Sequence, residues 1–429
     1  MRLGGRIAAA VEVLGDMAKR HRPASEALKD WGLSHRFAGS GDRAAIGNLV
    51  YDALRRKLSL PWRMGSGENS DLIFAVLLDS WGETVESLSA KLDGDNFAPA
   101  MPNDAALARF FAVRLEDAPL HVQADMPDWA ARLLAPVFEA NLAEEGRALS
   151  ERPPVDLRAN RLLSTRDRVL GEMPKAIGAL PCRFSPDGIR IPAGPGDYRQ
   201  PNVQVEPASQ KGWFEIQDEG SQLAAMLTGA SPGESVLDYC AGGGGKTLEL
   251  ASLMNNKGQI HATDSDKSRL APIFERLKRA ETRNVQVHPA KSDLSALEGK
   301  MDCVLIDAPC TGAGTWRRRP DAKWRLNEAQ LKQRCVEQAA ILDEAKKYVK
   351  PGGRLVYVTC SLFAEENAAQ AERFVAASPE FSFTDHSSRL AALIPGLRAH
   401  ETYLRASGIT LTPRLTGTDG FFVSVMDKK

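Results

Sequence analysis

The chain has 429 residues, of which 43% are hydrophobic and 26% are charged, and its 55 basic and 55 acidic side chains give a formal net charge of zero. This composition is typical of a soluble globular protein, and the length predicts two or three domains. The balanced charge excludes binding to nucleic acid through overall charge alone, so such a role requires a local basic patch. Apolar runs such as Ile73 to Leu78 are much shorter than the ~20 residues that span a bilayer, so we expect no membrane segment.

The N-terminus and the cysteines favour an intracellular protein. Glu12 interrupts the apolar stretch from Ile7 to Leu14 and no small-residue cleavage site follows it, so we expect no signal peptide. No two cysteines form a CxxC pair, and no histidine stands at a zinc-finger spacing from one. We therefore expect free thiols in a reducing cytoplasm and no metal, and we also expect a monomer. The cysteines are Cys182, Cys240, Cys303, Cys310, Cys335 and Cys360.

Residues 1–145 are predicted to form an all-helical domain. They are rich in Ala and Leu at helical spacing and contain few clusters of β-branched residues. In the stretch "DRAAIGNLVYDALRRKL" (42–58), Ala45, Leu49 and Ala53 form part of an apolar stripe. Asp42 stands where a helix N-cap belongs.

Residues 146–212 are predicted to form a small α/β module. The pair Pro153-Pro154 ends the helical pattern, and "VDLRANRL" (155–162) then alternates as a strand does. Asp187-Gly188 is a hairpin signal further along.

From residue 213 to 429 the pattern becomes one of strands alternating with helices, which predicts a doubly wound, Rossmann-like parallel sheet. We expect helices over 265–281 and 327–349, whereas 386–420 show only loop and helix. Ligands of such sheets bind at the carboxyl ends of the strands, so Cys240, Asp264, Asp307 and Cys360 should meet in one crevice. The expected strands are 235–240, 259–264, 285–289, 302–307, 354–359, 381–385 and 421–426.

The glycine-rich stretch "DYCAGGGGKT" follows the first of these strands. A P-loop would require glycine where Cys240 stands, and a GxGxxG fingerprint fails because its last position is Thr247 or Leu248. Asp264, at the end of the next strand, can accept hydrogen bonds from ribose hydroxyls. Loop and carboxylate together suit an adenosyl cofactor without a pyrophosphate, although a tight turn needed only for packing explains the glycines equally well.

Two thiols follow neighbouring strands of the predicted sheet. Cys310 lies in "DAPCTG" and Cys360 in "VTCSLFAEEN", where Glu365 and Glu366 are expected to open a helix. Adjacent strands lie ~4.8 Å apart, so these two sulfurs can reach one substrate. A single buried cysteine is usually a small hydrophobic residue, which is our interpretation of the cysteines at 182, 303 and 335.

A basic segment, "WRRRPDAKWR" (316–325), directly follows the Cys310 motif. A cationic turn of this kind is often only solvated, but its position favours a role in holding phosphates and stacking on unpaired bases. The residues expected to bind RNA here are Arg317, Arg318, Arg319, Lys323 and Arg325, with Trp316 and Trp324 as stacking platforms.

Five motifs together resemble the RsmB/NSUN family of RNA cytosine-C5 methyltransferases, in order over about 150–429. They are "WFEIQDEGSQLAA", "LDYCAGGGGKT", "IDAPCTGAGTWRRRPDAKWR", "VTCSLFAEEN" and "DGFF". One departure is visible: many members have Cys-Ala-Ala-Pro-Gly-Gly-Lys where this chain has Cys-Ala-Gly-Gly-Gly-Gly-Lys. Loss of the proline is expected to loosen the loop, which affects cofactor affinity more than cofactor identity. The helical half, with "GSGDRAAIGNLVYDALRR", is similar to the NusB-like extension of bacterial RsmB proteins.

The resemblance implies a reaction and a set of residues. Cys360 would add to carbon 6 of cytosine, Cys310 would assist product release, and Asp307 would contact the base edge. The module over 146–212 would be an RNA-recognition-like fold with Arg158 and Asn160 as contacts, and small-subunit ribosomal RNA is the expected substrate. S-adenosylmethionine would bind at Cys240, Ala241, Gly242, Gly243, Gly244, Gly245, Lys246, Asp264, Asp293 and Asp307.

Two alternatives remain open from the sequence. A DNA cytosine methyltransferase would use Cys310 as its nucleophile, which leaves the Thr359-Cys360-Ser361 block unexplained. A non-catalytic RNA-binding or ribosome-assembly factor would not need the intact Cys310, Cys360, Asp307 and Lys246.

Overall fold

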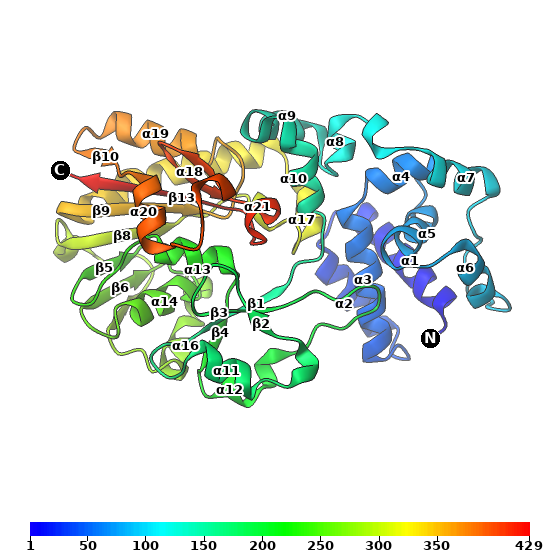
Figure 1. The fold of residues 1–429 in the computed structure, drawn as a ribbon, viewed down its shortest axis with the longest axis horizontal. Coiled ribbons are helices and arrows are strands. Elements are labelled where there is room, and N and C mark those ends of the chain that lie inside the picture. The colour runs from blue at the N-terminus through cyan, green and yellow to red at the C-terminus, as the bar shows by residue number, and fades with distance from the viewer. The chain divides into compact units, whose positions relative to one another are not determined.

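A computed structural model describes all residues from 1 to 429, and the chain divides into two compact units (Figure 1). The first unit contains residues 1–153 and two short segments from later in the chain, 193–201 and 316–326. The second unit contains the remaining residues, 154–192, 202–315 and 327–429, and holds every strand. The small module and the strand–helix region, which the sequence analysis separates at 212, thus belong to one unit.

The first unit is helical, as predicted for residues 1–145. Its core is built around α5, whose residues from Leu72 to Leu77 are all buried, because a helix that is apolar all round must lie in the interior. The surrounding helix α1 is amphipathic, with Ile7, Ala10 and Leu14 turned inward. The helices are α1 (Leu3–Arg20), α2 (Ala24–Ser34), α3 (Ser40–Arg55), α4 (Ser59–Met64), α5 (Asn69–Ser80), α6 (Val85–Leu92), α7 (Asp104–Ala112), α8 (Leu120–Gln123), α9 (Asp128–Phe138), α10 (Leu142–Ala148) and, from the later segment, α17 (Pro320–Arg325).

Asp42 does not cap α3 as the sequence predicts. The helix begins two residues earlier, at Ser40, and Gly39 occupies the N-cap position. The Asp42 carboxylate accepts hydrogen bonds from Arg6 and from the amino group of Met1, and these cations lower its pKa against the opposing effect of burial. Asp42 therefore ties the start of α1 to α3.

The segment 316–326 completes the helical unit from a distant part of the sequence. Arg55 of α3 donates two hydrogen bonds to the carbonyl of Arg317, at 3.0 and 2.9 Å, and the Trp324 indole donates to the carbonyl of Leu54 at 2.7 Å. Trp324 also packs against the core of this unit. Lys323, only 1% exposed, donates to the carbonyl of Arg55 at 3.3 Å.

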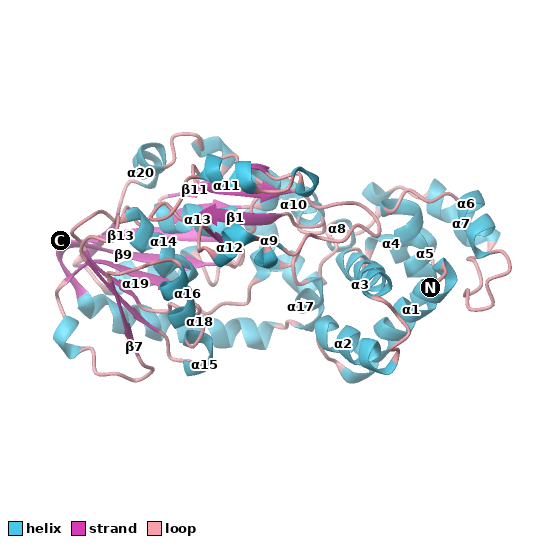
Figure 2. Cartoon of the chain, turned by 90° about the horizontal axis from the view of Figure 1, so that it is seen from below, coloured by secondary structure: helices cyan, strands magenta, loops and turns pink.

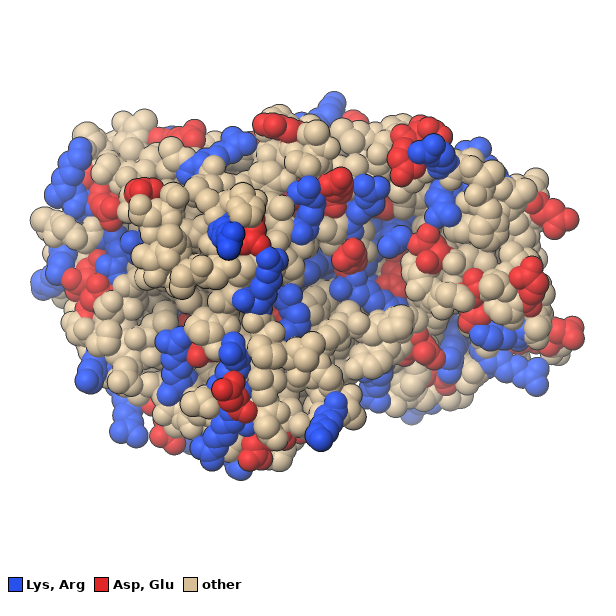
Figure 3. All heavy atoms as spheres, in the orientation of Figure 1, with Lys and Arg blue, Asp and Glu red and all other residues tan.

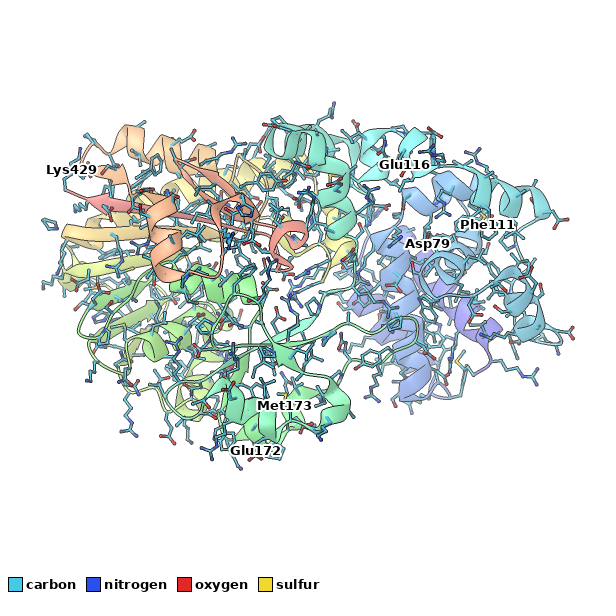
Figure 4. All side chains as sticks on the ribbon, viewed as in Figure 1. Asp79, Phe111, Glu116, Glu172, Met173 and Lys429 are labelled. Carbon is cyan, nitrogen blue, oxygen red and sulfur yellow. The ribbon has the colours of Figure 1, made fainter.

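A small antiparallel sheet opens the second unit, with strand order β2-β3-β1-β4. Its helices cover a core that includes Leu157, Ile189 and Phe214. Met173, at the end of α11, is buried against this core, whereas the neighbouring Glu172 is exposed (Figure 4). The elements are β1 (Val155–Ala159), α11 (Arg166–Glu172), β2 (Leu180–Pro181), β3 (Gly188–Ile191), α12 (Pro207–Gln210) and β4 (Phe214–Ile216).

The large sheet of the second unit has nine strands in the order β11-β12-β13-β9-β8-β5-β6-β7, with β10 paired to β13. Strands β5 to β9 are parallel, and β13 is antiparallel to β9. The sheet is therefore parallel through its middle, as predicted, with an antiparallel edge. The strands are β5 (Ser235–Asp238), β6 (Gln259–Thr263), β7 (Val285–His288), β8 (Met301–Asp307), β9 (Val349–Thr359), β10 (Phe381–Phe383), β11 (Tyr403–Arg405), β12 (Gly408–Leu411) and β13 (Phe421–Lys428).

Both faces of this sheet are covered by helices, as a doubly wound sheet requires (Figure 2). Successive residues of β8 point to opposite faces of the sheet and so belong to different hydrophobic cores. Cys303 and Leu305 join a core with α13, α14 and α20, whereas Val304 and Ile306 join one with α18 and α19. The helices are α13 (Glu219–Met226), α14 (Gly245–Leu253), α15 (Lys267–Leu270), α16 (Ile273–Arg279), α18 (Glu328–Ala345), α19 (Ala368–Ala377), α20 (His386–Leu393) and α21 (Pro413–Thr416).

Two local differences from the sequence prediction have physical causes. The helix expected over 265–281 is broken into α15 and α16 next to Pro272, which supplies no backbone N–H. The helix expected to open at Glu365 begins instead at Ala368, because the backbone of Asn367, with φ −112° and ψ −104°, is not helical.

Basic and acidic side chains are interspersed over the face shown in Figure 3, in keeping with the net charge of zero. None of the helices combines the length and the hydropathy needed to cross a membrane.

Candidate active site

The site lies where the order of the parallel strands reverses. From β5 the chain builds outward through β6 to β7, and then returns to the other side of β5 with β8 and β9. The crevice between the carboxyl ends of β5 and β8 is the position at which open α/β sheets bind ligands. The glycine loop follows β5, and Asp307 ends β8.

Two of the predicted residues meet at this edge. The sulfur atoms of Cys310 and Cys360 are 3.4 Å apart, and both thiols are partly exposed although nearly all of the neighbouring strand residues are buried. The hydrogen bond with Cys360, together with burial, raises the pKa of the Cys310 thiol well above its ordinary value. Cys310 therefore keeps its proton and can donate it to the sulfur of Cys360.

Backbone hydrogen bonds hold the two thiol-bearing turns against each other. Ala308 donates to the carbonyl of Val358 at 2.8 Å, which extends the pairing of β8 with β9 by one residue. Beyond the thiols, Gly314 donates to the carbonyl of Cys360 at 2.9 Å. A side chain at Gly314 would lie 2.1 Å from the carbonyl oxygen of Gly420, so this close approach requires glycine. The sulfur pair is therefore fixed by the backbone on both sides.

Glu366, whose role no sequence motif predicts, also holds the Cys310 turn in place. Its fully buried carboxylate accepts the backbone N–H of Thr311 at 2.8 Å and the Thr311 hydroxyl at 2.5 Å. Gln338 of α18 donates to the same carboxylate at 2.9 Å and to the carbonyl of Pro309 at 3.0 Å. The acidic pair after the Thr-Cys-Ser block was visible in the sequence, but it was interpreted there as a helix start.

Asp307 is joined to Lys246, the second residue of α14. The Lys246 ammonium donates to the Asp307 carboxylate at 2.7 Å, and the side chains are 7% and 35% exposed. Burial opposes the charge of Lys246, but Asp307 outweighs it and raises the pKa of Lys246. Lys246 is therefore a cation at neutral pH.

The glycine loop is folded against the end of β6. Asp264, 3% exposed, accepts hydrogen bonds from the backbone N–H groups of Gly242 and Asp266, each at 2.9 Å. Gly242 and Gly244 have φ of +49° and +83°, a region that favours glycine, and a side chain at Gly244 would meet Ile273 at 2.5 Å. Cys240 and Ala241 lead into this loop, and Gly245 begins α14.

Asp238, at the end of β5, carries an unusual carboxyl group. It is completely buried and accepts one hydrogen bond, at 2.7 Å from the Thr247 hydroxyl, while its Oδ1 atom has no partner. Burial raises its pKa to about 7.

One predicted cofactor residue lies apart from this cluster. Asp293 is exposed in the loop after β7, and its carboxylate accepts the backbone N–H of Ser295 at 2.9 Å, which lowers its pKa. It makes no hydrogen bond or ion pair with the other site residues.

Arg158 and Asn160 are not on the surface, and the expected direct contact with RNA is corrected. Arg158 is 2% exposed and donates to Gln217 at 2.7 Å. Asn160 is 3% exposed and donates to the carbonyls of Gly212 and Ala280, both at 3.0 Å. Both side chains are committed to contacts within the protein.

The basic segment also differs from the prediction. Arg317 and Lys323 are 4% and 1% exposed inside the helical unit, so these two are corrected as RNA contacts, and the Trp316 ring, 1% exposed, cannot stack on a base. Arg319 and Arg325 are exposed, and Arg318 is partly exposed. Burial lowers the pKa of Lys323 to about 8, although Asp125 opposes this shift.

The chain is similar to known methyltransferases. Residues 225–427 match the family described as 16S rRNA methyltransferase RsmB/F. The chain is 32% identical over 286 residues to Ribosomal RNA small subunit methyltransferase B of Cronobacter sakazakii, and 31% identical over 306 residues to the protein of the same name from Photorhabdus laumondii. Over these residues the chain is similar to the RsmB/F methyltransferases.

The RsmB-like matches take in 66% and 71% of this chain but only 61% and 66% of the two relatives, so they span less than two thirds of the relatives' length. The fold is shared with the crystal structure of PH0851, with a TM-score of 0.72 and 24% identity over the whole of both chains. A methyltransferase homolog from Pyrococcus horikoshii has a TM-score of 0.57 and 25% identity over 72% of this chain and 98% of its own.

Proposed function

We propose that this protein methylates carbon 5 of a cytosine in RNA, with S-adenosylmethionine as the methyl donor and Cys360 as a covalent catalyst. The observation that carries the proposal is the meeting of the two sulfur atoms at 3.4 Å beside the Lys246–Asp307 ion pair. Similarity to the RsmB/F family supports the reaction class, since the similar proteins are named as ribosomal RNA methyltransferases.

Cys360 has the surroundings that a nucleophilic thiolate needs. A thiol adds to an aromatic carbon only as its thiolate, and a nearby cation together with a hydrogen-bond donor favours that form. Lys246 supplies the positive charge, and the Cys310 thiol, which keeps its own proton, supplies the hydrogen bond. Addition of the Cys360 sulfur to carbon 6 places electron density on carbon 5, which is otherwise a poor nucleophile.

Cys310 and Asp307 act at the two ends of the same reaction. After carbon 5 has been methylated and has lost its proton to water, the bond between carbon 6 and the Cys360 sulfur breaks and the electron pair returns to sulfur. The Cys310 thiol, 3.4 Å away, stabilises that departing thiolate by hydrogen bonding. Asp307 is the more exposed member of its ion pair, and its free oxygen is available to the edge of the base.

The residues around the glycine loop fit an adenosyl group. A carboxylate has about four acceptor positions, and the protein occupies two of those on Asp264, which leaves acceptors for two ribose hydroxyls. The positive φ of Gly242 and Gly244 keeps side chains out of the loop, so that its backbone can approach the ligand. When bound, S-adenosylmethionine supplies an electrophilic methyl group. Residues 240–246 and Asp264 would hold it, with Asp293 as a more distant candidate.

Small-subunit ribosomal RNA is the proposed substrate, because the relatives carry that RNA in their names. The helical unit would correspond to the NusB-like extension, and the small sheet to an RNA-recognition-like module. RNA contacts are assigned to the exposed cations of the basic segment, Arg319 and Arg325, with Arg318, and no longer to Arg158, Asn160, Arg317 or Lys323. The target base must leave its stack to reach two thiols, at a cost of a few kcal/mol in a duplex.

The test is transfer of a labelled methyl group from S-adenosylmethionine to RNA by the purified protein. Bisulfite sequencing of total RNA from a deletion strain should locate the cytosine that loses its methyl group. Label on RNA but not on DNA supports the proposal, and label on DNA alone contradicts it. Failure to bind S-adenosylmethionine in calorimetry would favour the non-catalytic RNA-binding alternative.

A further inference from the structure

The glycine loop of this chain has Gly243 where many members of the RsmB/NSUN family, which the chain resembles, have proline. Four glycines in a row, from Gly242 to Gly245, leave the backbone with more freedom than any other sequence would. Replacing proline with glycine also increases the freedom that must be lost when the loop takes one conformation. The loop therefore needs a second constraint if it is to stay in the shape described above.

That constraint comes from Arg276 on α16. Its guanidinium donates to the carbonyl oxygen of Gly243 at 2.6 Å. No other hydrogen bond reaches that carbonyl, whereas the loop residues on either side are already held: Gly242 by Asp264, and Gly244 by its own backbone N–H, which donates to Ala241 at 2.9 Å. Arg276 thus holds the carbonyl of Gly243, the residue at which a proline would have fixed φ.

Arg276 is itself fixed in direction. Two of its nitrogen atoms donate to the same oxygen of Glu215, at 3.1 and 3.0 Å, and the Glu215 side chain is 5% exposed in β4. The other Glu215 oxygen accepts from Arg279 at 2.6 Å. Glu215 therefore orients Arg276, and the neighbouring Arg279 shares the carboxylate without touching the loop.

We infer that Arg276 is a positioning residue that replaces the family's proline by holding Gly243 in the conformation that accepts the cofactor. The inference rests on the proposed function for the identity of the ligand. If the competent loop conformation is only a fraction of the population, the apparent affinity falls by that fraction. Losing a hydrogen bond from a charged donor changes the equilibrium constant between the competent loop conformation and the others by about tenfold.

The first experiment measures the loop without any ligand. Backbone hydrogen exchange of residues 241–246 is compared in the wild type, Arg276→Ala and Arg279→Ala. We expect about tenfold faster exchange in Arg276→Ala and wild-type rates in Arg279→Ala. Arg279→Ala is the matched control because it also removes a cation from Glu215. In either variant the remaining arginine still pairs with the Glu215 carboxylate. Unchanged exchange in Arg276→Ala, in a variant that melts as the wild type does, overturns the inference.

The second experiment tests the replacement of proline directly. Gly243 does not have a positive φ, its N–H makes no hydrogen bond within the protein, and a Cβ there would lie 3.4 Å from Arg276. In Arg276→Ala that neighbour is gone, so Gly243→Pro in the same chain should slow loop exchange again. If loop exchange in the double variant is no slower than in Arg276→Ala alone, the idea that the Arg276 hydrogen bond takes the place of a proline is wrong.

Calorimetry with S-adenosylmethionine then separates this inference from the proposed function. We expect Arg276→Ala to weaken binding about tenfold, the double variant to regain part of it, and Arg279→Ala to stay within twofold of the wild type. If even the wild type fails to bind, the proposed function is wrong, while the exchange data still decide whether Arg276 holds the loop. Equal weakening by both alanine variants overturns the inference.

Discussion

Lys246 and Asp307, which are 61 positions apart in the sequence, form an ion pair of 2.7 Å that joins the start of α14 to the end of β8. The pair links the glycine loop to the turn that carries Cys310. It therefore connects the place where a methyl donor would bind with the place where the base would be attacked.

Replacing Lys246 with Met should lower kcat about 100-fold, because Asp307 and the Cys360 thiolate then lose their shared cation. The measurement is single-turnover methyl transfer together with the melting temperature. Lys300→Met, at an exposed lysine of the same unit, is the control and should have wild-type activity. Activity of Lys246→Met within twofold of the wild type would show that the cation has no catalytic role.

The two thiols should give opposite phenotypes. Cys360→Ala removes the nucleophile and should abolish methylation, whereas Cys310→Ser should accumulate a covalent complex with RNA that survives on a denaturing gel. Cys335→Ser changes a thiol that donates to the carbonyl of Glu365, away from the Cys310–Cys360 pair, and should leave activity within about twofold. Trapping by Cys360→Ala instead of Cys310→Ser would reverse the assigned roles.

Glu366→Gln should lower kcat about tenfold without changing the affinity for S-adenosylmethionine. The glutamine amide has one acceptor oxygen in place of two, so one of the donors from Thr311 or Gln338 is left unpaired. Leaving a buried donor without an acceptor costs about 1–3 kcal/mol of free energy. Glu365→Gln is the neighbouring control. The idea that Glu366 holds the Cys310 turn fails if both variants lose activity equally.

Asp238 should make stability depend on pH. In the folded protein the Asp238 carboxyl keeps its proton up to about pH 7, whereas in the unfolded chain it loses the proton near its ordinary pKa of 3.8. Between these two pH values the folded state therefore binds more protons than the unfolded state. The free energy of unfolding therefore falls as pH rises through this window, by about 4 kcal/mol at most, and is constant for this group above it.

Asp238→Asn can still accept the Thr247 hydroxyl bond and does not titrate. In denaturant titrations at pH 4 to 8, the variant should gain stability relative to the wild type as pH rises to 7, and the difference should then be constant. Parallel curves over this range would mean that Asp238 does not titrate as described.

The exposed cations of the basic segment should contribute to RNA affinity through phosphate contacts. The double change Arg319→Glu and Arg325→Glu should weaken RNA binding at low salt and make the salt dependence less steep. Lys323→Met, at a buried position in the same segment, should leave the affinity within twofold. Equal losses in both variants would point to folding of the segment and not to contact with RNA.

The sequence predicted the parts of the site that follow strands, because the carboxyl ends of parallel strands share one edge. Cys310 and Cys360 could be paired in this way from two short motifs alone. Glu366 could not, since its role depends on a turn after β9 that folds back onto Thr311. The burial of Lys323 and Arg317 was also invisible, because charged residues next to tryptophans have the same pattern whether they lie on a surface or inside another unit.

The expected strands of the large sheet lie within a few residues of the observed ones, except at the start of β9, where Val349 to Gly353 include proline and glycines. The prediction of only loop and helix over 386–420 is wrong, since β11 and β12 lie there. The helix over 265–281 was predicted as one element because its apolar spacing continues across Pro272. Arg158 and Asn160 were assigned to RNA from family resemblance, and their real partners lie far away in the sequence, at Gln217 and Ala280.

The late arrival of residues 316–326 in the chain has a consequence for synthesis on the ribosome. A nascent chain that has emerged only as far as Pro153 still lacks Lys323 and Trp324, so the carbonyls of Leu54 and Arg55 have not yet met these donors. The helices made first are therefore finished only after β8 has been translated. Fragments that stop before Trp316 should therefore aggregate and be degraded rapidly, even if all of their own helices have formed.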